Sequence, residues 1–524
     1  MNQLTYLEGF RSTVRRYPDR EAIVTTDGRS FTYAELDERT DALAAALEER
    51  APGERVAVVA HNGVGVVESM LAAQKRGRAN VQLSTRGAAG ELASMMETAD
   101  AAGVMFSDGL ADAGAALTER MDLEVVVGIG EEAAAVDGAE SYEAMLAEAD
   151  PAAAPEEPAT DPAESAIFFT SGTTSAPKAI LVDQWQSWLA ANQPALEMSL
   201  TASDRALVCS PWYHMVTSQA WVLPHLLVGA TLVVQPTFEP PESLALMEEH
   251  DVTGLLAVPT QLEAMLAAQD DVDADLSALS YIRTGGAVVP ESLIDRVRER
   301  FTEGVFNTYG LTEGVGNLAY AYPEDQFDHP GTIGKGSFLW NLRVVEAADP
   351  PKKPDPDAVV DPGQTGEIIG RSLQMIDGYI ERPEETEAAF VEATDGGQDW
   401  LRTGDVAQVD EDGYLVVIDR VDNMILSGGE NVYPEEVQQA LKDHPAVRDA
   451  GVVGLPDEQW GQLVVAAVVA SGDVTEEELE EHCKAHDTLA DFKRPRRYVF
   501  ADELPKTATG TLVRGEVDEM FDQS

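Results

Sequence analysis

The stretch at residues 170–178 constrains the fold of this chain more than any other. It reads Thr-Ser-Gly-Thr-Thr-Ser-Ala-Pro-Lys and follows the apolar run at 166–169, which predicts a buried strand. Small and hydroxylated residues let a loop present several backbone N–H groups and hydroxyls to one point, and Lys178 adds a compact positive charge. Such a loop suits a polyphosphate. It lacks the Gly-Lys pair that closes a P-loop, and taken alone it is also compatible with a Ser/Thr-rich surface turn.

Strand-like and helix-like segments alternate through the first part of the chain. Apolar runs at 56–60, 104–106 and 125–127 predict buried strands, and the segments at 36–50 and 66–75 predict helices. This alternation is typical of an α/β fold with a largely parallel sheet.

The end of the chain reads differently. The dipeptide Asp412-Gly413 predicts a hairpin turn between short strands at 400–405 and 414–418. Beyond it, a strand-like run at 463–470 and an acidic helix at 476–485 indicate a small α+β domain. We therefore expect an N-terminal domain at residues 1–420 and a C-terminal domain at residues 421–524.

Acidic residues dominate the charge. The 524 residues include 93 Asp and Glu against 36 Lys and Arg, which gives a net charge of −57. Nucleic acid and anionic membranes would repel such a chain, so neither is an expected partner. The charge predicts a solvated acidic surface working in high salt, where the screening length falls to about 3 Å at 1 M.

The remaining composition indicates a cytoplasmic protein. Two cysteines, Cys209 and Cys483, stand far apart without metal-ligand spacing, so we expect no disulfide framework. No basic and apolar leader precedes the first domain, and no apolar run is long enough to span a membrane. The oligomeric state is open, with a homodimer as one option.

Four motifs together resemble a known family. They are the loop at 170–178, Tyr-Gly-Leu-Thr-Glu at 309–313, Thr-Gly-Asp at 403–405, and Asp-Arg at 419–420 followed by Ser-Gly-Gly-Glu-Asn-Val-Tyr-Pro-Glu-Glu at 427–436. Their order over nearly the whole chain resembles the adenylate-forming superfamily of acyl-CoA synthetases, peptide-synthetase adenylation domains and beetle luciferases. The resemblance implies an α/β fold, with a large N-terminal domain of mixed sheets and a small mobile C-terminal α+β lid.

The same resemblance implies a reaction with ATP, Mg²⁺ and coenzyme A. A carboxylate attacks the α-phosphate of ATP, and a thiol then displaces AMP. The first step joins two anions, so it needs charge neutralisation more than a nucleophilic side chain. Catalytic roles are implied for Lys178, Thr312, Glu313, His214 and Thr511, with Glu313 as the Mg²⁺ ligand. Nucleotide or coenzyme contacts are implied for Thr170, Ser171, Gly172, Thr173, Thr174, Lys178, Gly285, Gly286, Ala287, Asn307, Tyr309, Gly310, Thr312, Asp405, Arg420, Gly428, Gly429 and Glu430.

The acid-binding residues and the pivot of the lid follow from the same alignment of motifs. Asp422 falls at the hinge position, and Trp460 and Lys493 are candidate coenzyme A contacts. Each of these residues also has an ordinary structural interpretation: His214 can be a packed histidine beside Trp212, for example. The candidate lining of the acid site is His214, Met215, Thr217, Gly286, Gly310, Gly316 and Asn317.

The chain departs from the family at its last motif. The family's usual Gly-Lys pair is Gly510-Thr511 here. In the family, this lysine orients the carboxylate and the α-phosphate. Loss of such a charge costs on the order of 10²–10³ in rate. Lys506 could substitute, adenylation could be slow, or the chain could have been altered to trap one state. Ser175 and Ala179 replace two glycines of the phosphate loop.

The leading hypothesis is therefore an AMP-forming carboxylate–CoA ligase for a fatty or aromatic acid. One alternative is a free-standing adenylation protein that loads the thiol of a carrier protein. A second alternative, motivated by Thr511, is a non-catalytic protein that binds a nucleotide or an acyl-adenylate.

Overall fold

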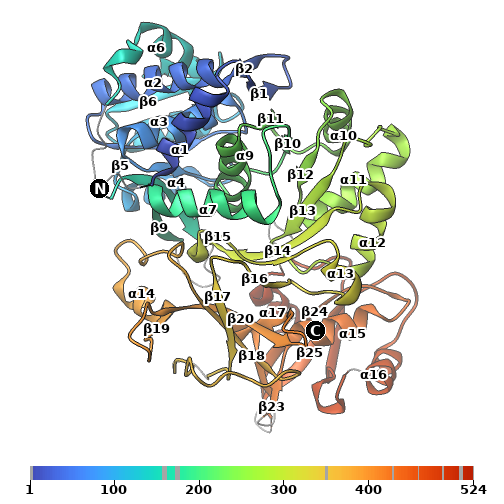
Figure 1. Cartoon of the computed structure of the whole chain (residues 1–524). Coiled ribbons are helices and arrows are strands. Elements are labelled where there is room, and N and C mark those ends of the chain that lie inside the picture. Colours follow the sequence, from blue (N-terminus) through green and yellow to red (C-terminus); the bar gives the residue numbers. More distant parts are fainter. Residues whose placement is uncertain are drawn as a thin grey trace. The chain divides into compact units, whose positions relative to one another are not determined.

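The chain forms two compact α/β units, a large N-terminal one and a small C-terminal one, as the sequence predicts (Figure 1). The computed structural model describes residues 4–155, 162–170, 177–348, 352–427, 430–457, 460–486, 489–506 and 512–522. The first unit comprises Met1–Leu342, Gly370–Glu392 and Gly396–Leu401, and the second comprises Arg343–Ile369, Ala393–Asp395 and Arg402–Ser524. Strands β17 (Asn341–Val345), β18 (Thr365–Arg371) and β20 (Trp400–Val409) each begin in one unit and end in the other.

The first sheet of the large unit contains the strands on either side of the hydroxyl-rich loop. Its order is β7-β6-β5-β3-β4-β8-β9, and every neighbouring pair is parallel except β8 and β9. A parallel sheet needs crossover helices, which explains the alternation seen in the sequence. The strands are β3 (Arg55–Val59), β4 (Asn80–Gln82), β5 (Ala101–Ser107), β6 (Val125–Ile129), β7 (Glu140–Ser141), β8 (Glu164–Thr170) and β9 (Lys178–Asp183).

Helices α3, α4, α5 and α6 contact strands of this sheet. Helix α2 begins with a capping box in which Thr32 and Glu35 satisfy each other's backbone N–H groups. Helix α3 is buried along its whole length and contacts both α2 and the sheet. The helices are α1 (Tyr6–Arg16), α2 (Tyr33–Arg50), α3 (Val64–Arg76), α4 (Ala89–Thr98), α5 (Ala111–Arg120) and α6 (Tyr142–Glu148).

A second sheet in the same unit places most of the other predicted site residues. Its order is β16-β15-β14-β13-β12-β10-β11-β1-β2, parallel from β14 to β1 and antiparallel at both ends. The alternation of strands and helices in the sequence suggests one sheet. Periodicity does not show which strands are neighbours, so it does not reveal the division into two sheets. The strands are β1 (Glu21–Thr25), β2 (Ser30–Thr32), β10 (Arg205–Val208), β11 (Thr231–Val234), β12 (Gly254–Leu256), β13 (Tyr281–Gly285), β14 (Val305–Leu311), β15 (Gly316–Ala321) and β16 (Lys335–Gly336).

One of the helical segments associated with this sheet contains a π-helix. It covers Ser218–Val222, between the short α8 (Met215–Thr217) and α9 (Leu223–Val228). A π-helix leaves some backbone carbonyls without their usual partners and is frequent at functional sites. The other helices of the large unit are α7 (Gln184–Glu197), α10 (Pro240–Glu249), α11 (Pro259–Val272), α12 (Glu291–Arg300), α13 (Asp325–Asp328) and α14 (Pro383–Ala389), with the short strand β19 (Phe390–Val391) nearby in sequence.

The small unit contains most of the predicted hairpin. Strands β20 and β21 (Leu415–Arg420) are antiparallel, and Gly413 in the turn between them has a positive φ of 85°. A four-stranded path β23-β22-β25-β24 follows, with β26 paired to β25. Its elements are β22 (Ile425–Ser427), β23 (Glu430–Val432), α15 (Pro434–Lys442), β24 (Val447–Asp457), β25 (Gly461–Ala470), α16 (Glu476–Ala485), β26 (Arg497–Phe500) and α17 (Arg514–Asp522). No helix within the described ranges has both the length and the apolar character to cross a membrane.

Candidate active site

The hydroxyl-rich loop is closed by a pair of strand residues. Thr170 ends β8, Lys178 begins β9, and the two are antiparallel partners. The loop residues between them that the sequence points to, Ser171, Gly172, Thr173 and Thr174, lie outside the described residues. The hydroxyl oxygen of Thr170 is buried and has no hydrogen-bond partner within the described part of the chain. A buried hydroxyl without a partner is costly, so this group is suited to a ligand that supplies one.

The side chain of Lys178 lies over an aromatic ring that the sequence analysis missed. Its Nζ is 4.3 Å from the centroid of the Tyr379 ring, which is a cation–π distance. No carboxylate among the described residues forms an ion pair with Lys178. The ammonium is therefore available for an anionic ligand.

Tyr379 also contacts the carboxylate that the sequence predicts as a metal ligand. Its hydroxyl donates to Oε1 of Glu313 at 2.6 Å. The backbone holds this arrangement: Ile376 donates from its N–H to the carbonyl of Glu313 at 3.0 Å, and Ile380 donates to the carbonyl of Ala179 at 2.8 Å. The segment 376–380 therefore joins the turn that contains Glu313 to the strand that begins at Lys178.

Thr312 and Glu313 lie in a single 3₁₀ turn, Thr312–Gly314, directly after β14. Both side chains are half-buried. The turn ends at Val315, whose φ of 54° is a rare value for a β-branched residue. Backbone strain of this kind costs about 1–3 kcal/mol and persists where the surrounding structure imposes it, often at functional sites.

Two of the predicted glycines are required by close backbone packing. A Cβ on Gly285 would lie 2.1 Å from the carbonyl oxygen of Thr308, and one on Gly310 would lie 2.1 Å from that of Gly316. Gly286 and Ala287 are exposed just beyond the end of β13. These residues thus form an open turn beside β14, where a planar group could approach the backbone.

Two predicted adenine contacts on β14 differ in exposure. Asn307 is buried, and its Nδ2 donates to the carbonyl of Thr332 at 2.9 Å. Tyr309 is half-buried and packs against an apolar cluster around Leu318 and Trp340. Asn307 thus shapes the turn after Thr332 in this structure, whereas part of Tyr309 is accessible for stacking.

The predicted acid-binding residues come from several elements. His214 precedes α8, which contains Met215 and Thr217, and Gly286 follows β13. Gly310 lies on β14, and Gly316 and Asn317 lie on β15.

The ring of His214 is 4.6 Å from that of Tyr213. His214 is accessible to solvent at its surface. Desolvation by the surrounding protein, and to a smaller extent the charge of Arg86, lowers the pKa of its imidazole. Thr217 is buried, and its hydroxyl lacks a hydrogen-bond partner among the described residues. A neutral imidazole and a free hydroxyl are compatible with a neighbouring carboxylic acid.

A buried arginine that the sequence analysis did not select connects these elements. Arg283 is fully buried on β13. Its guanidinium donates to the Ala220 carbonyl in the π-helix, to Thr308 Oγ1 on β14 at 3.2 Å, and to Asn317 Oδ1 on β15 at 2.6 Å. Burial lowers its pKa, and no described carboxylate pairs with it. No sequence pattern marks a cation that is buried against neutral partners.

The predicted ribose-binding residues of the small unit are brought together. Asp405 on β20 and Arg420 on β21 are antiparallel partners, and Nη1 of Arg420 lies 2.9 Å from Oδ1 of Asp405. Gly404 has a φ of 70°, and a Cβ there would lie 2.8 Å from Nη2 of Arg420. Glycine at this position therefore makes room for the arginine.

Other predicted residues of the small unit are described only in part. Asp422 lies in the 3₁₀ turn Val421–Asn423, and Glu430 begins β23. The side chains of both residues lie outside the described part of the structure. Gly428, Gly429 and Thr511 also lie outside the described residues. Lys506, the candidate substitute for the missing lysine, forms an ion pair with Asp449 at 2.5 Å. Of the candidate coenzyme A contacts, Trp460 is partly exposed and Lys493 pairs with Glu436 at 2.7 Å.

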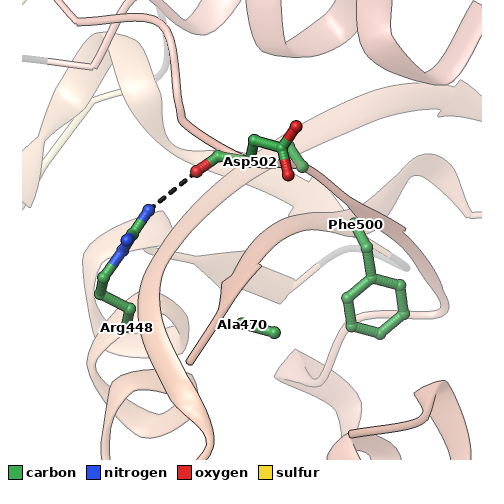
Figure 2. Close-up of a pocket in the computed structure, with 5 residues that line it drawn as sticks. Arg448, Ala470, Phe500 and Asp502 are labelled. Atoms are coloured by element: carbon green, nitrogen blue, oxygen red, sulfur yellow. Dashed lines mark hydrogen bonds between the residues drawn. The ribbon is translucent and has the colours of Figure 1, made fainter. Parts of the chain in front are cut away.

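An open hollow in the small unit contains none of the predicted site residues. Its volume is about 460 Å³, and its lining includes Arg448, Ala470, Phe500, Ala501 and Asp502. Figure 2 shows Arg448 and Phe500 on opposite sides of Ala470, with the guanidinium donating to the backbone carbonyl of Asp502 at 2.8 Å. The described parts of the chain hold no cluster of three or more His, Cys, Asp or Glu with metal-binding geometry.

Comparisons with known proteins agree with these motifs. The family model described as "AMP-binding enzyme" matches residues 10–380, and the model of the AMP-binding enzyme C-terminal domain matches residues 436–511. A 3-[(3aS,4S,7aS)-7a-methyl-1,5-dioxo-octahydro-1H-inden-4-yl]propanoyl:CoA ligase of Mycobacterium tuberculosis is 34% identical, with 97% of each chain covered. A feruloyl-CoA synthase of Amycolatopsis sp. is 33% identical over 94% of each chain.

A solved structure extends the similarity to the whole fold. The o-succinylbenzoate CoA synthetase of Bacillus subtilis, in complex with its acyl-adenylate intermediate, matches with a TM-score of 0.81 and 26% identity, covering 99% of this chain and 98% of that one. The same enzyme with ATP and a magnesium ion matches with a TM-score of 0.80 and 26% identity, covering 97% and 99%. The chain therefore belongs to the AMP-binding enzymes, and it is an adenylate-forming acid–CoA ligase of that family.

Proposed function

We propose that this ligase activates a carboxylic acid that carries a ring, and that its preferred substrate is an aromatic acid. The adenylation step of the proposal rests on the grouping of Lys178 and Glu313 around Tyr379 in the large unit. This grouping offers a cation that has no ion-pair partner among the described residues, at the start of β9, and a carboxylate that can bind a metal. The choice of acid is supported by the relatives, whose names specify feruloyl, succinylbenzoate and a bicyclic propanoyl group. Fatty acids are the alternative substrate class.

In the reaction proposed, the acid first reacts with ATP. A carboxylate oxygen attacks the α-phosphorus, the bond to the β-phosphate oxygen breaks, and pyrophosphate leaves. The thiolate of coenzyme A then attacks the acyl carbon, and AMP leaves with the electron pair of the mixed anhydride. Adenylation brings two anions together, so groups that neutralise charge in the transition state contribute most.

The residues of the large unit fit these needs. Lys178, with the loop from Thr170 to Thr174, would neutralise the phosphates, and Thr312 would donate to the α-phosphate. Glu313 accepts from Tyr379 with one carboxylate oxygen, and its other oxygen would help to hold Mg²⁺, a hard cation that prefers oxygen ligands. When bound, Mg²⁺ would supply further neutralisation of phosphate charge. Gly285, Gly286, Ala287 and Tyr309 would frame the adenine.

In the small unit, Asp405 would accept both ribose hydroxyl protons while Arg420 orients it. By resemblance, Asp422 would be the pivot of a lid at residues 421–524, and Gly428, Gly429 and Glu430 would border the pantetheine path. Thr511 keeps a hydroxyl donor where the family has lysine, so we infer slow adenylation. Transfer to a carrier-protein thiol remains the alternative for the second step.

The acidic composition supports a further proposal about the cell. We infer a cytoplasm with concentrated salt. Some of the chain's few cations are already used in ion pairs within the fold and do not offset the negative charge of the surface: Lys75 contacts Asp37 and Asp41, and Arg76 contacts Glu48. The remaining surface is then strongly negative and gains stability from screening. A homodimer stays a prediction, which light scattering in 2 M KCl tests.

A substrate screen tests the proposed function. The enzyme is incubated in 2 M KCl with ATP, Mg²⁺, coenzyme A and one acid at a time: ferulate, 2-succinylbenzoate, indoleacetate, benzoate, octanoate and palmitate. Mass spectrometry quantifies the thioester and AMP. The proposal expects the highest kcat/KM with one of the ring-bearing acids. A clear preference for palmitate or octanoate would contradict it.

A further inference from the structure

Tyr379 contacts two side chains of opposite charge. Its ring faces the Lys178 ammonium and its hydroxyl bonds to the Glu313 carboxylate. Neither charge has an ion-pair partner among the described residues. By contrast, Arg39, Lys75 and other cations of the same unit pair directly with carboxylates.

The main chain around Tyr379 is fixed at several points, so its position is a property of the fold. Backbone bonds from Ile376 to Glu313 and from Ile380 to Ala179 hold the two ends of the segment. The N–H of Tyr379 donates to Oγ1 of Thr386 at 2.9 Å. Residue 379 also forms an isolated antiparallel bridge with Ile180. The ring therefore stays beside the strand that begins at Lys178.

A direct ion pair between Lys178 and Glu313 would work against the reaction. The pair would have to break before the ammonium could bind phosphate and the carboxylate could bind a metal. An aromatic ring attracts the ammonium more weakly and more adaptably than a carboxylate does, because the ring carries no net charge. A phenol hydroxyl likewise orients a carboxylate without neutralising it.

We propose that Tyr379 is a positioning residue that prevents an ion pair between Lys178 and Glu313. Its ring holds the lysine side chain where it can bind the triphosphate, and its hydroxyl orients the carboxylate toward the metal. The proposal rests on the roles of Lys178 and Glu313 in the proposed function. It assigns separate tasks to the two parts of one side chain. Variants that remove only the hydroxyl, or both the ring and the hydroxyl, can therefore distinguish this positioning role from a general structural role of Tyr379.

The experiment measures equilibrium affinity for a fluorescent ATP analogue, with and without Mg²⁺, and the unfolding temperature of each variant. Tyr379→Phe keeps the ring and removes the hydroxyl. It should leave the metal-free affinity within about twofold and reduce the gain from Mg²⁺ about tenfold, as expected for loss of a hydrogen bond to a charged group. Tyr379→Leu should weaken the metal-free affinity as well, because Lys178 can then pair with Glu313.

Two further variants complete the design. Adding Glu313→Gln to Tyr379→Leu should restore the metal-free affinity, because no carboxylate is left to hold the lysine. Tyr322→Phe is the matched control, since Tyr322 also donates to a carboxylate, that of Glu197, which is not one of the residues assigned to the phosphates or the metal. It should change neither affinity.

The outcomes separate this inference from the proposed function. Equal loss of both affinities in Tyr379→Phe and Tyr379→Leu, or no rescue by Glu313→Gln, would overturn the role given to Tyr379. Unchanged affinities in both variants would also overturn it. If Lys178→Met in the wild-type background left ATP affinity unchanged, the proposed phosphate-binding role itself would fail. If Tyr379→Leu does not fold, Tyr379→Phe alone decides through its response to Mg²⁺.

Discussion

The guanidinium of Arg283 donates from Nη2 to Oδ1 of Asn317 at 2.6 Å, and within the described part of the chain no carboxylate forms an ion pair with it. Asn317 in turn donates from Nδ2 to the hydroxyl of Tyr320. The same guanidinium reaches the Ala220 carbonyl of the π-helix. One buried cation thus joins β13, β15 and the segment that follows His214. Of the residues predicted to line the acid site, Gly286 follows β13, and Gly316 and Asn317 lie on β15.

Removal of this cation should loosen the acid site. Arg283→Met leaves the Ala220 carbonyl and Asn317 Oδ1 without their donor, although it also removes a buried charge. We expect a loss of about 2–4 kcal/mol in the free energy of unfolding in urea, and a larger rise in KM for the acid than for ATP. The exposed Arg296→Met is the control and should change neither quantity by much. Equal rises in the two KM values would count against a role in the acid site.

Buried His225 should make stability depend on pH. Its Nδ1 donates to the Trp221 carbonyl at 2.5 Å and its Nε2 accepts from the hydroxyl of Tyr281 at 2.9 Å. Burial lowers its pKa to about 4. The unfolded chain binds this proton near pH 6.5, so the stability due to neutral His225 is complete above that pH. It is lost progressively as the pH falls toward about 4.

The size of this effect follows from the shift. Between pH 7 and pH 4 the wild type should lose about 3 kcal/mol more than His225→Gln does, at 1.36 kcal/mol per pKa unit. Urea unfolding at each pH in 2 M KCl measures the difference. Parallel pH curves for the two proteins would show that His225 is not held neutral.

Restoring the missing lysine should speed the first half-reaction. Thr511→Lys places an ammonium where the family has one, and we expect faster adenylation by a factor on the order of 10²–10³. Thioester formation from a preformed acyl-adenylate should change little. Stopped-flow measurement of pyrophosphate release separates the two steps. Slower adenylation in this variant would contradict the role assigned to residue 511.

Salt should stabilise the fold. Exposed acidic side chains repel one another at low ionic strength, and screening removes most of this repulsion above about 1 M salt. We therefore expect a higher melting temperature in 2 M KCl than in 0.1 M KCl, measured by calorimetry. Equal melting temperatures would rule out the inferred adaptation.

Much of the fold could be predicted from local patterns. The acidic helix α16 has the predicted bounds, and the Asp412-Gly413 turn joins β20 and β21. The strand before the hydroxyl-rich loop is β8, and the run of parallel strands follows from the alternation of strands and helices. These features depend on periodicity and turn chemistry within a few residues, which a sequence displays directly.

The central contacts of the candidate site could not be predicted in this way. Tyr379 meets Lys178 through a backbone bridge between segments far apart in the chain, and nothing near Gly378-Tyr379 indicates that pairing. Arg283 lies in an otherwise apolar strand. A charged residue in such a strand can indicate the edge of a sheet or a functional site, but the sequence does not show which residues it contacts. The sequence analysis identified Lys178 and Glu313 from motifs, but the side chain that links them needs the fold.

The most direct test of the account follows one oxygen atom. The ligase is supplied with the best acid from the screen, labelled with ¹⁸O in its carboxylate, together with ATP, Mg²⁺ and coenzyme A in 2 M KCl. Attack of the carboxylate on the α-phosphorus predicts that each AMP formed carries one ¹⁸O atom, detected by mass spectrometry. Unlabelled AMP, or ADP with labelled phosphate, would show that no acyl-adenylate forms and would contradict the account.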